Sequence, residues 1–192
     1  MFRSLPFLLL CLFTSASVFA DQGSIDRYNE ETIGLLDDLD SCLLRVDYVI
    51  DEAESIGYKY GQAYAYYLKG YILRVQDDLG KAFLANLKGL NILQGVKDER
   101  ASETLVRLYL NTGEILKRHF KYDEAIQYYS EGLAIAEKEN LKKWIIDLQY
   151  NIGNTYKWNG NLSLAADYLH QAYLEANKEN DEHTIVNALN QM

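Results

Sequence analysis

Small residues recur along this chain at a fixed spacing, and this pattern limits its possible folds more than any other feature. A glycine is followed 12 residues later by alanine and 19 residues later by glycine or alanine, and the set occurs three times, 43 and then 40 residues apart. Because self-similarity at such a period is typical of stacked repeats, we expect a repeat protein. Small residues are needed where helices cross closely, since larger side chains would push them apart. The positions are Gly70, Ala82, Gly89, Gly113, Ala125, Gly132, Gly153, Ala165 and Ala172.

Apolar residues show the spacing of α-helices almost throughout, which predicts an all-α fold. Short polar connections between the segments favour antiparallel helix pairs. The turn inside each pair carries Asp77, Phe120 or Gly160, so we expect turns of different build, with Gly160 in the left-handed conformation. The predicted helices are 29–38, 40–56, 60–76, 80–95, 101–118, 122–138, 142–158, 162–178 and 182–192.

The N-terminus has the pattern of a secretory signal peptide. Arg3 precedes an apolar run, and small residues stand three and one positions before Asp21, which suits cleavage after Ala20. We therefore expect 1–20 to be removed and the chain to be exported to a periplasmic or other extracytoplasmic location. One alternative is an uncleaved anchor, although the run is shorter than the roughly 20 residues of a membrane span. The other is a lipoprotein box at Cys11.

Charge argues against two classes of partner. The chain has a formal net charge of −9, and loss of Arg3 with the signal peptide would make it −10. Nucleic acids and membrane surfaces both favour basic patches, so neither is expected as a partner. No stretch within 21–192 is apolar enough to span a bilayer. Cys42 would be the one remaining thiol, and we expect it to pack as a small apolar side chain.

The repeat resembles the tetratricopeptide repeat (TPR). The resemblance is carried by the three small positions, by an aromatic residue or leucine three residues after the glycine, and by Tyr129 and Leu169 sixteen residues after it. The spacing of about 40 residues is similar to the longer variant of bacterial envelope signalling proteins. The resemblance implies a right-handed α-solenoid of antiparallel helix pairs. Asn86 departs from the pattern at the large position, so we expect weaker packing there.

The resemblance covers about 40–192 and sets the expected domain organisation. A short N-terminal segment with one helix, 21–39, precedes the TPR-like domain. The domain would comprise a degenerate pair to about 57, repeats at about 60–100, 101–140 and 141–180, and the start of a further repeat at 181–192.

The last predicted helix carries an apolar face for which the chain offers no further partner helix. It is either a capping helix docked on 162–178 or the beginning of a repeat in a longer protein, and we favour the second interpretation. The residues of this face are Ile185, Val186, Ala188, Leu189 and Met192.

The sequence carries no pattern of a catalytic, metal or cofactor site. His119, His170 and His183 lack the spacing of metal ligands, and neither a phosphate-binding loop nor a nucleophile elbow is present. The run 98–100 is most simply a turn and a helix start. We therefore expect a protein that is not an enzyme and needs no cofactor.

The resemblance implies a binding surface instead. In the TPR family, the first helix of each pair lines a concave groove at fixed positions around the repeat glycine. Aromatic and arginine side chains are enriched in binding surfaces, although any one tyrosine could equally belong to the core. Tyr67, Leu110 and Tyr150 stand where the carboxylate-clamp subtype needs lysine, so that subtype is not expected. The predicted groove residues are Tyr64, Tyr67, Tyr71, Arg74, Arg107, Leu110, Glu114, Lys117, Asp147, Tyr150, Asn154 and Lys157.

Two functions follow as hypotheses. In the first, the chain is an exported module that binds a protein or peptide and forms the extracytoplasmic input part of a longer bacterial signalling protein, membrane-anchored through its continuation. In the second, it is a complete, free-standing periplasmic scaffold or assembly factor. Groove binding predicts that Tyr67→Ala combined with Arg107→Ala weakens partner capture without unfolding the chain.

Overall fold

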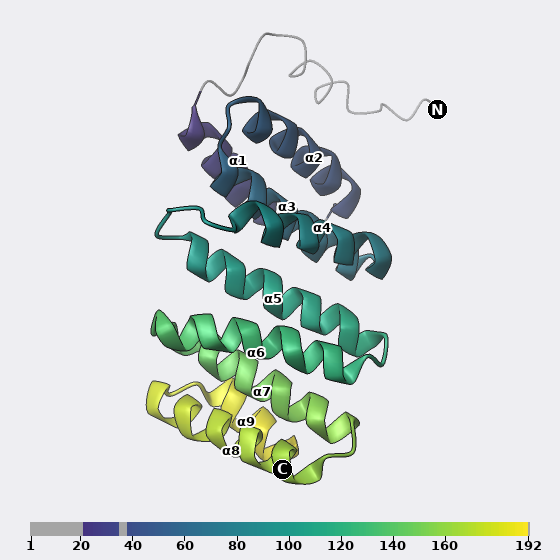
Figure 1. Cartoon of the computed structure of the whole chain (residues 1–192), viewed down its shortest axis with the longest axis vertical. Coiled ribbons are helices and arrows are strands. Elements are labelled where there is room, and N and C mark those ends of the chain that lie inside the picture. Colours follow the sequence, from purple (N-terminus) through teal and green to yellow (C-terminus); the bar gives the residue numbers. More distant parts are fainter. Residues whose placement is uncertain (1–20, 35–37, 192) are drawn as a thin grey trace, which may run out of the picture.

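The computed structural model describes residues 21–34 and 38–191, and all regular structure within these ranges is α-helical (Figure 1). The helices stack one after another along the long axis of the molecule, with α1 and α2 at one end and α8 and α9 at the other. They are α1 (Gln22–Ile33), α2 (Leu39–Ser55), α3 (Lys59–Val75), α4 (Leu79–Leu93), α5 (Ala101–Arg118), α6 (Tyr122–Lys138), α7 (Lys142–Trp158), α8 (Leu162–Glu179) and α9 (Glu182–Gln191).

The helices form two layers. The backbone of each odd-numbered helix lies close to that of the next odd-numbered helix, from α1 through to α9, whereas the backbones of successive even-numbered helices stay farther apart within the described ranges. Even-numbered helices meet through longer side chains, as where Phe83 of α4 lies edge-to-face against Tyr128 of α6. Because helices on the inside of a curve lie closer together than those on the outside, the stack bends toward the odd-numbered layer. We call the solvent-facing side of that layer the inner face.

The small residues of the repeat lie at close helix crossings, as predicted. A Cβ atom on Gly113 would lie 2.4 Å from the ring of Tyr129, and one on Gly153 would lie 2.9 Å from Leu169 Cγ. Both partners stand sixteen residues after their glycine and are buried. Glycine is therefore required because the large side chain of the second helix occupies the place of a Cβ.

Asn86, at the large position of the earlier repeat, is a correction to the expectation of weaker packing. Its side chain is fully buried, and a Cβ on Gly70 would lie 2.0 Å from its Oδ1. The amide thus fills the crossing as Tyr129 does in the next repeat. Its Oδ1 accepts a 3.1 Å hydrogen bond from Asn111 Nδ2 of α5, whereas its Nδ2 is buried and has no hydrogen-bond partner among the described residues.

The turns inside the pairs are more uniform than their sequences suggest. Gly160 has the predicted positive φ of 83°, and Asp77 and Phe120 adopt the same conformation, with φ of 66° and 61°. The expectation of turns with different builds is therefore wrong for the backbone. Closure of each helix requires the left-handed conformation whichever residue occupies it.

The first helix lies earlier than predicted. It extends over Gln22–Ile33 instead of 29–38, because the Asp21 side chain caps it by accepting a 2.8 Å hydrogen bond from Ser24 N. Ile25 anchors the helix in the core and is fully buried. The other eight predicted helices agree with the structure to within two residues at each end.

Cys42 is buried, as predicted, and its thiol donates to the carbonyl oxygen of Thr32, with an S···O distance of 3.7 Å. None of the described helices is long and apolar enough to cross a membrane. The predicted signal peptide and the Ala20 side of its cleavage site lie outside the described residues.

At the other end of the stack, α9 packs against α7 and α8. Ala188 and Thr184 are buried in this contact, whereas Val186 and Leu189 are each 55% exposed. The predicted apolar face of this helix is thus divided between a packed side and a solvent-facing side.

Candidate functional site

A ladder of four tyrosines follows α3 on the inner side of the molecule. Tyr60, Tyr64, Tyr67 and Tyr71 are spaced four, three and four residues apart, which places them on one helix face. Their successive ring centroids are 6.1, 5.6 and 6.5 Å apart, within the range of favourable aromatic pairs. Tyr60 is buried and the other three are partly exposed. Burial of Tyr64 raises the pKa of its phenol.

Arg107 joins this tyrosine ladder to α7. Its guanidinium carbon lies 5.8 Å from the ring centroid of Tyr67 and 5.0 Å from that of Trp144. Glu103, one turn earlier on α5, holds the arginine with an Nη2–Oε1 ion pair of 2.7 Å and accepts a 3.2 Å hydrogen bond from Trp144 Nε1. Aromatic surface therefore continues from α3 across α5 to α7.

Partial burial and charge pairing act in opposite directions on Glu103. Burial alone would raise the pKa of this carboxyl group, but the hydrogen bond and the charge of Arg107 outweigh it and lower the pKa below its ordinary value. Glu103 is therefore ionised at neutral pH. Its charge fixes Arg107 between the two rings instead of leaving it as a freely moving cation.

Arg74 is held in a similar way at the other end of the ladder. Its guanidinium carbon lies 5.2 Å from the ring centroid of Tyr71, and its Nε donates to Asn111 Oδ1. Asn111 in turn donates to the buried Asn86. A polar chain thus leads from the inner face into the crossing of α3 and α4.

The predicted residues of α5 include an ion pair that links three helices. Lys117 Nζ lies 2.6 Å from Glu114 Oε1 and 3.3 Å from Asn151 Oδ1 of α7. Tyr129 of α6 donates to the same Glu114 oxygen at 3.0 Å. Leu110 packs at the edge of the core cluster that these helices enclose.

On α7, burial raises the pKa of Asp147, and the charge of Lys143 only partly offsets this effect. Asn154 Oδ1 is buried and has no hydrogen-bond partner among the described residues. Lys157 Nζ donates to the carbonyl oxygen of Gln191 at 2.8 Å. Tyr150 is partly exposed on the same helix.

All twelve predicted groove residues thus lie on α3, α5 and α7, and none is fully buried in the core: Lys157 is exposed and the others are partly buried. The structure brings Tyr64, Tyr67, Tyr71 and Arg107 into one aromatic surface. It places Glu114 and Lys117 in a separate ion pair. Their role in partner binding stays a prediction.

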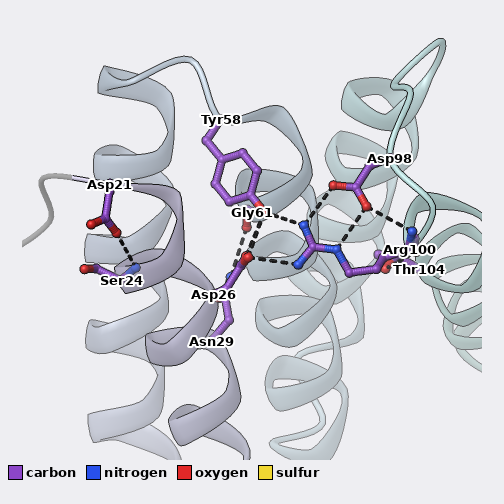
Figure 2. Close-up of polar contacts among 9 residues, drawn as sticks. All are labelled: Asp21, Ser24, Asp26, Asn29, Tyr58, Gly61, Asp98, Arg100 and Thr104. Carbon is purple, nitrogen blue, oxygen red and sulfur yellow. Dashed lines mark hydrogen bonds and ion pairs between the residues drawn. The ribbon is translucent and has the colours of Figure 1, made fainter.

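A second polar network lies at the N-terminal end of the stack (Figure 2). Arg100 Nη1 donates to Asp26 at 2.8 Å, and its Nη2 donates to Tyr58 Oη at 2.7 Å and to Asp98 at 2.8 Å. Tyr58 donates to Asp26 at 2.8 Å, and burial together with this bond raises the pKa of the phenol. The network connects α1, the residue before α3 and the residue before α5.

Beside this network, α1, α3 and α5 enclose a cleft of about 190 Å³. Tyr60 and Tyr64 of the ladder line it, together with Glu103, Arg107 and Arg100 from α5 and its cap. Glu30 of α1 completes the acidic side of its lining.

Four residues of this surface escaped the sequence argument. Tyr60 lies one turn before Tyr64, and its spacing to the other tyrosines could have identified it. Trp144, Glu103 and Arg100 fall outside the register around the repeat glycine that the family resemblance supplies. Arg100 was assigned only to a turn, because its partner Asp26 is 74 residues away.

Comparison with protein-family profiles and with curated proteins gives no match to this chain. Solved structures are similar. Aspartyl phosphate phosphatase F from Bacillus subtilis matches with a TM-score of 0.78 and 12% identity over 86% of this chain. A signal transduction ATPase with numerous domains from Pyrococcus horikoshii, which carries a tetratricopeptide repeat sensor, matches with a TM-score of 0.77 and 18% identity over 91%. MamA matches with a TM-score of 0.53 and 17% identity over 85%.

The chain spans 43% of the B. subtilis protein and 27% of the P. horikoshii protein, so it covers less than half of these two neighbours. It spans 99% of MamA. At these identities the likeness concerns the fold alone. The chain has the fold of a TPR-like helical solenoid.

Proposed function

We propose that this chain is a protein-interaction module that binds a peptide or a segment of a protein on its inner face. One observation carries the proposal: the tyrosine ladder, Arg107 and Trp144 form a continuous, partly exposed aromatic surface across three stacked helices. Rigid aromatic side chains and arginine supply most of the binding energy in many protein interfaces. Their rotamers are already held here by neighbours, so little conformational entropy is lost on binding.

The proposal extends to the setting of this module. The signal-peptide pattern of 1–20 supports export to a periplasmic or extracytoplasmic location. The P. horikoshii neighbour is described as using its repeats as a sensor, which supports an input role in a longer signalling protein of the 40-residue repeat variant. The alternative is a free-standing periplasmic scaffold. In either setting the inner face would bind the partner.

Peptide binding is tested by selection and substitution. A phage-displayed library of random peptides is panned against the folded chain 21–192, and the dissociation constants of enriched peptides are measured by fluorescence anisotropy. Tyr67→Ala should raise these dissociation constants about fivefold or more, since it removes a central ring of the surface. The matched control is Tyr128→Ala, which removes a partly exposed tyrosine from α6 in the outer layer.

Tyr67→Ala alone is a sharper variant than its combination with Arg107→Ala, because loss of Arg107 would also free Glu103 and Trp144. Circular dichroism melting establishes that each variant is folded. Enriched peptides that bind the Tyr67 variant as tightly as the natural chain would remove the inner face from the proposal, and so would the absence of any enriched peptide.

Export is tested separately by expressing the chain from Met1 and determining the N-terminus by mass spectrometry. The expected product is found outside the cytoplasm and begins at Asp21. An α-amino group there would lie at the N-cap of α1, so processing would leave the helix and its cap complete. A product that keeps Met1 and stays in the cytoplasm would contradict export.

A further inference from the structure

The cleft between α1, α3 and α5 has more hydrogen-bond acceptors than donors available to a ligand. Its volume of about 190 Å³ corresponds to roughly six water molecules, enough for one long side chain. Three carboxylates line it, from Asp26, Glu30 and Glu103, against two guanidinium groups. Which of these groups are already paired decides what the cleft can bind.

Both arginines are engaged by carboxylates of the chain itself. Arg100 uses Nε, Nη1 and Nη2 on Asp98, Asp26 and Tyr58. Arg107 uses Nε and Nη2 on Glu103. An anionic ligand would have to displace one of these partners, because the guanidinium charges are compensated within the cleft.

The acceptors, in contrast, are not used up. Arg107, through Nε and Nη2, and Trp144, through Nε1, donate to the same oxygen of Glu103, Oε1. Its other oxygen, Oε2, has no hydrogen bond among the described residues. Glu30 is exposed and forms no ion pair in this part of the chain. Asn29 also lines the cleft: its side chain is buried, its Nδ2 donates to the carbonyl oxygen of Gly61 at 3.2 Å, and its Oδ1 has no donor.

Aromatic rings form the remaining wall. The rings of Tyr60 and Tyr64 are stacked with an interplanar angle of 29°. Tyr60 is buried and the guanidinium carbon of Arg100 lies 4.0 Å from its ring centroid, so Tyr64, which is partly exposed, offers the accessible ring. Aromatic faces attract cations and cover the alkyl part of long basic side chains. Partial exclusion of water by these rings strengthens the attraction between a carboxylate and a ligand cation.

We propose that this cleft binds a lysine or arginine side chain of the peptide that the inner face recognises. The incoming ammonium or guanidinium group donates to Glu30 and to Oε2 of Glu103, and its alkyl stem lies against the ring of Tyr64. The site is one end of the surface proposed above for peptide binding, and this inference rests on that proposal. It adds a charge requirement to one position of the ligand.

The experiment uses three pools of acetylated and amidated peptides. The pools share degenerate positions of neutral aliphatic, aromatic and hydroxyl residues, and differ only in one central residue, which is Lys, Gln or Glu. Binding to folded 21–192 is measured by fluorescence anisotropy. We expect the Lys pool to bind about fivefold more tightly than the Gln pool, with the Glu pool weakest, and added salt should reduce the difference.

Substitutions assign the preference to the cleft. Glu30→Gln keeps the shape of an exposed side chain and should remove most of the preference for the Lys pool, whereas Glu30→Lys should reverse it toward the Glu pool. Asp51→Asn is the matched control, because it removes one negative charge from an exposed position on α2 and should leave the preference unchanged.

The outcomes separate the two proposals. If no pool binds the natural chain, peptide binding by the inner face is refuted and the inference is refuted with it. If the pools bind equally, or if the Glu pool binds best, peptide binding stands and the cationic site is refuted. A preference for the Lys pool that Glu30→Gln and Glu30→Lys leave unchanged likewise overturns the assignment to this cleft.

Discussion

At the scale of single residues, Phe120 is held in a conformation that disfavours it. It ends α5 with a φ of 61°, and its side chain is 78% exposed, in edge-to-face contact with Tyr122 at a centroid distance of 6.3 Å. Hydrogen bonds from Phe120 N and Lys121 N to carbonyls of the last turn close the helix and impose this conformation. The equivalent position of the next turn is Gly160, for which a positive φ has no steric penalty.

Phe120→Gly should therefore stabilise the chain by about 0.5–1 kcal/mol, because relief of the left-handed strain outweighs the greater backbone entropy of glycine in the unfolded state. Urea unfolding followed by circular dichroism measures the change. The reciprocal substitution, Gly160→Ala, should destabilise the chain by about 1 kcal/mol. A loss of stability in Phe120→Gly would mean that the exposed ring contributes more through its contacts than the backbone strain removes.

At the scale of helices, the close packing of each helix pair depends on the side chain that faces the repeat glycine. Tyr129, Leu169 and Asn86 differ in chemistry, yet each fills the space beside a glycine sixteen residues earlier. The geometry of the pair is thus maintained by complementary volume. At Asn86 the polar group is only half satisfied, since its Oδ1 accepts from Asn111 on the next helix while its Nδ2 is buried without a partner among the described residues.

Two glycine substitutions test this explanation. Gly113→Ala would place a Cβ 2.4 Å from the buried ring of Tyr129 and should destabilise the chain by about 1–3 kcal/mol through overpacking. Gly80→Ala on α4 meets nothing within 4 Å and should stabilise it by up to about 1 kcal/mol through helix propensity. Both are measured by urea unfolding. Equal effects of the two substitutions would show that the helices can move apart at the crossing. Packing would then not explain why the small residues recur at a fixed spacing in this chain.

At the scale of the whole molecule, tyrosine carries much of the aromatic packing. The chain contains sixteen tyrosines, and burial raises the pKa of several that lie far apart in the stack. Burial and the hydrogen bond to Glu131 raise the pKa of Tyr109 to about 12. Burial also raises the pKa of Tyr58, Tyr60, Tyr64, Tyr129 and Tyr150.

These shifts predict a loss of stability on the alkaline side. A tyrosine whose pKa is higher in the folded state favours folding fully below its unfolded pKa of about 10, and this contribution is lost as the pH rises toward the folded value. The free energy of unfolding should therefore fall as the pH rises above about 10. Parallel measurements of tyrosinate absorbance and of helix content over this pH range test the prediction. Ionisation of all tyrosines near their free pKa, with the helices still intact, would contradict it.

Local pattern was sufficient for most of the helices. The periodic apolar residues and the small positions of the repeat are set by neighbours within about one helical turn or one helix pair, so they could be recognised without coordinates. The placement of Tyr64, Tyr67 and Tyr71 on one helix followed from the same periodicity. The first helix was misplaced because its start depends on one capping side chain, Asp21, in a segment with few apolar residues.

The sequence by itself determined the all-helical repeat and the close crossings, and the TPR resemblance supplied the positions of the predicted groove residues. Only the tertiary structure decided which side chains meet across helices. Arg107 reaches Trp144, and Arg100 reaches Asp26, through contacts between residues 37 and 74 positions apart. Such contacts, and the cleft beside them, depend on the angle and offset with which successive helices stack. Those quantities arise from the packing of whole side-chain layers and are not contained in any local segment.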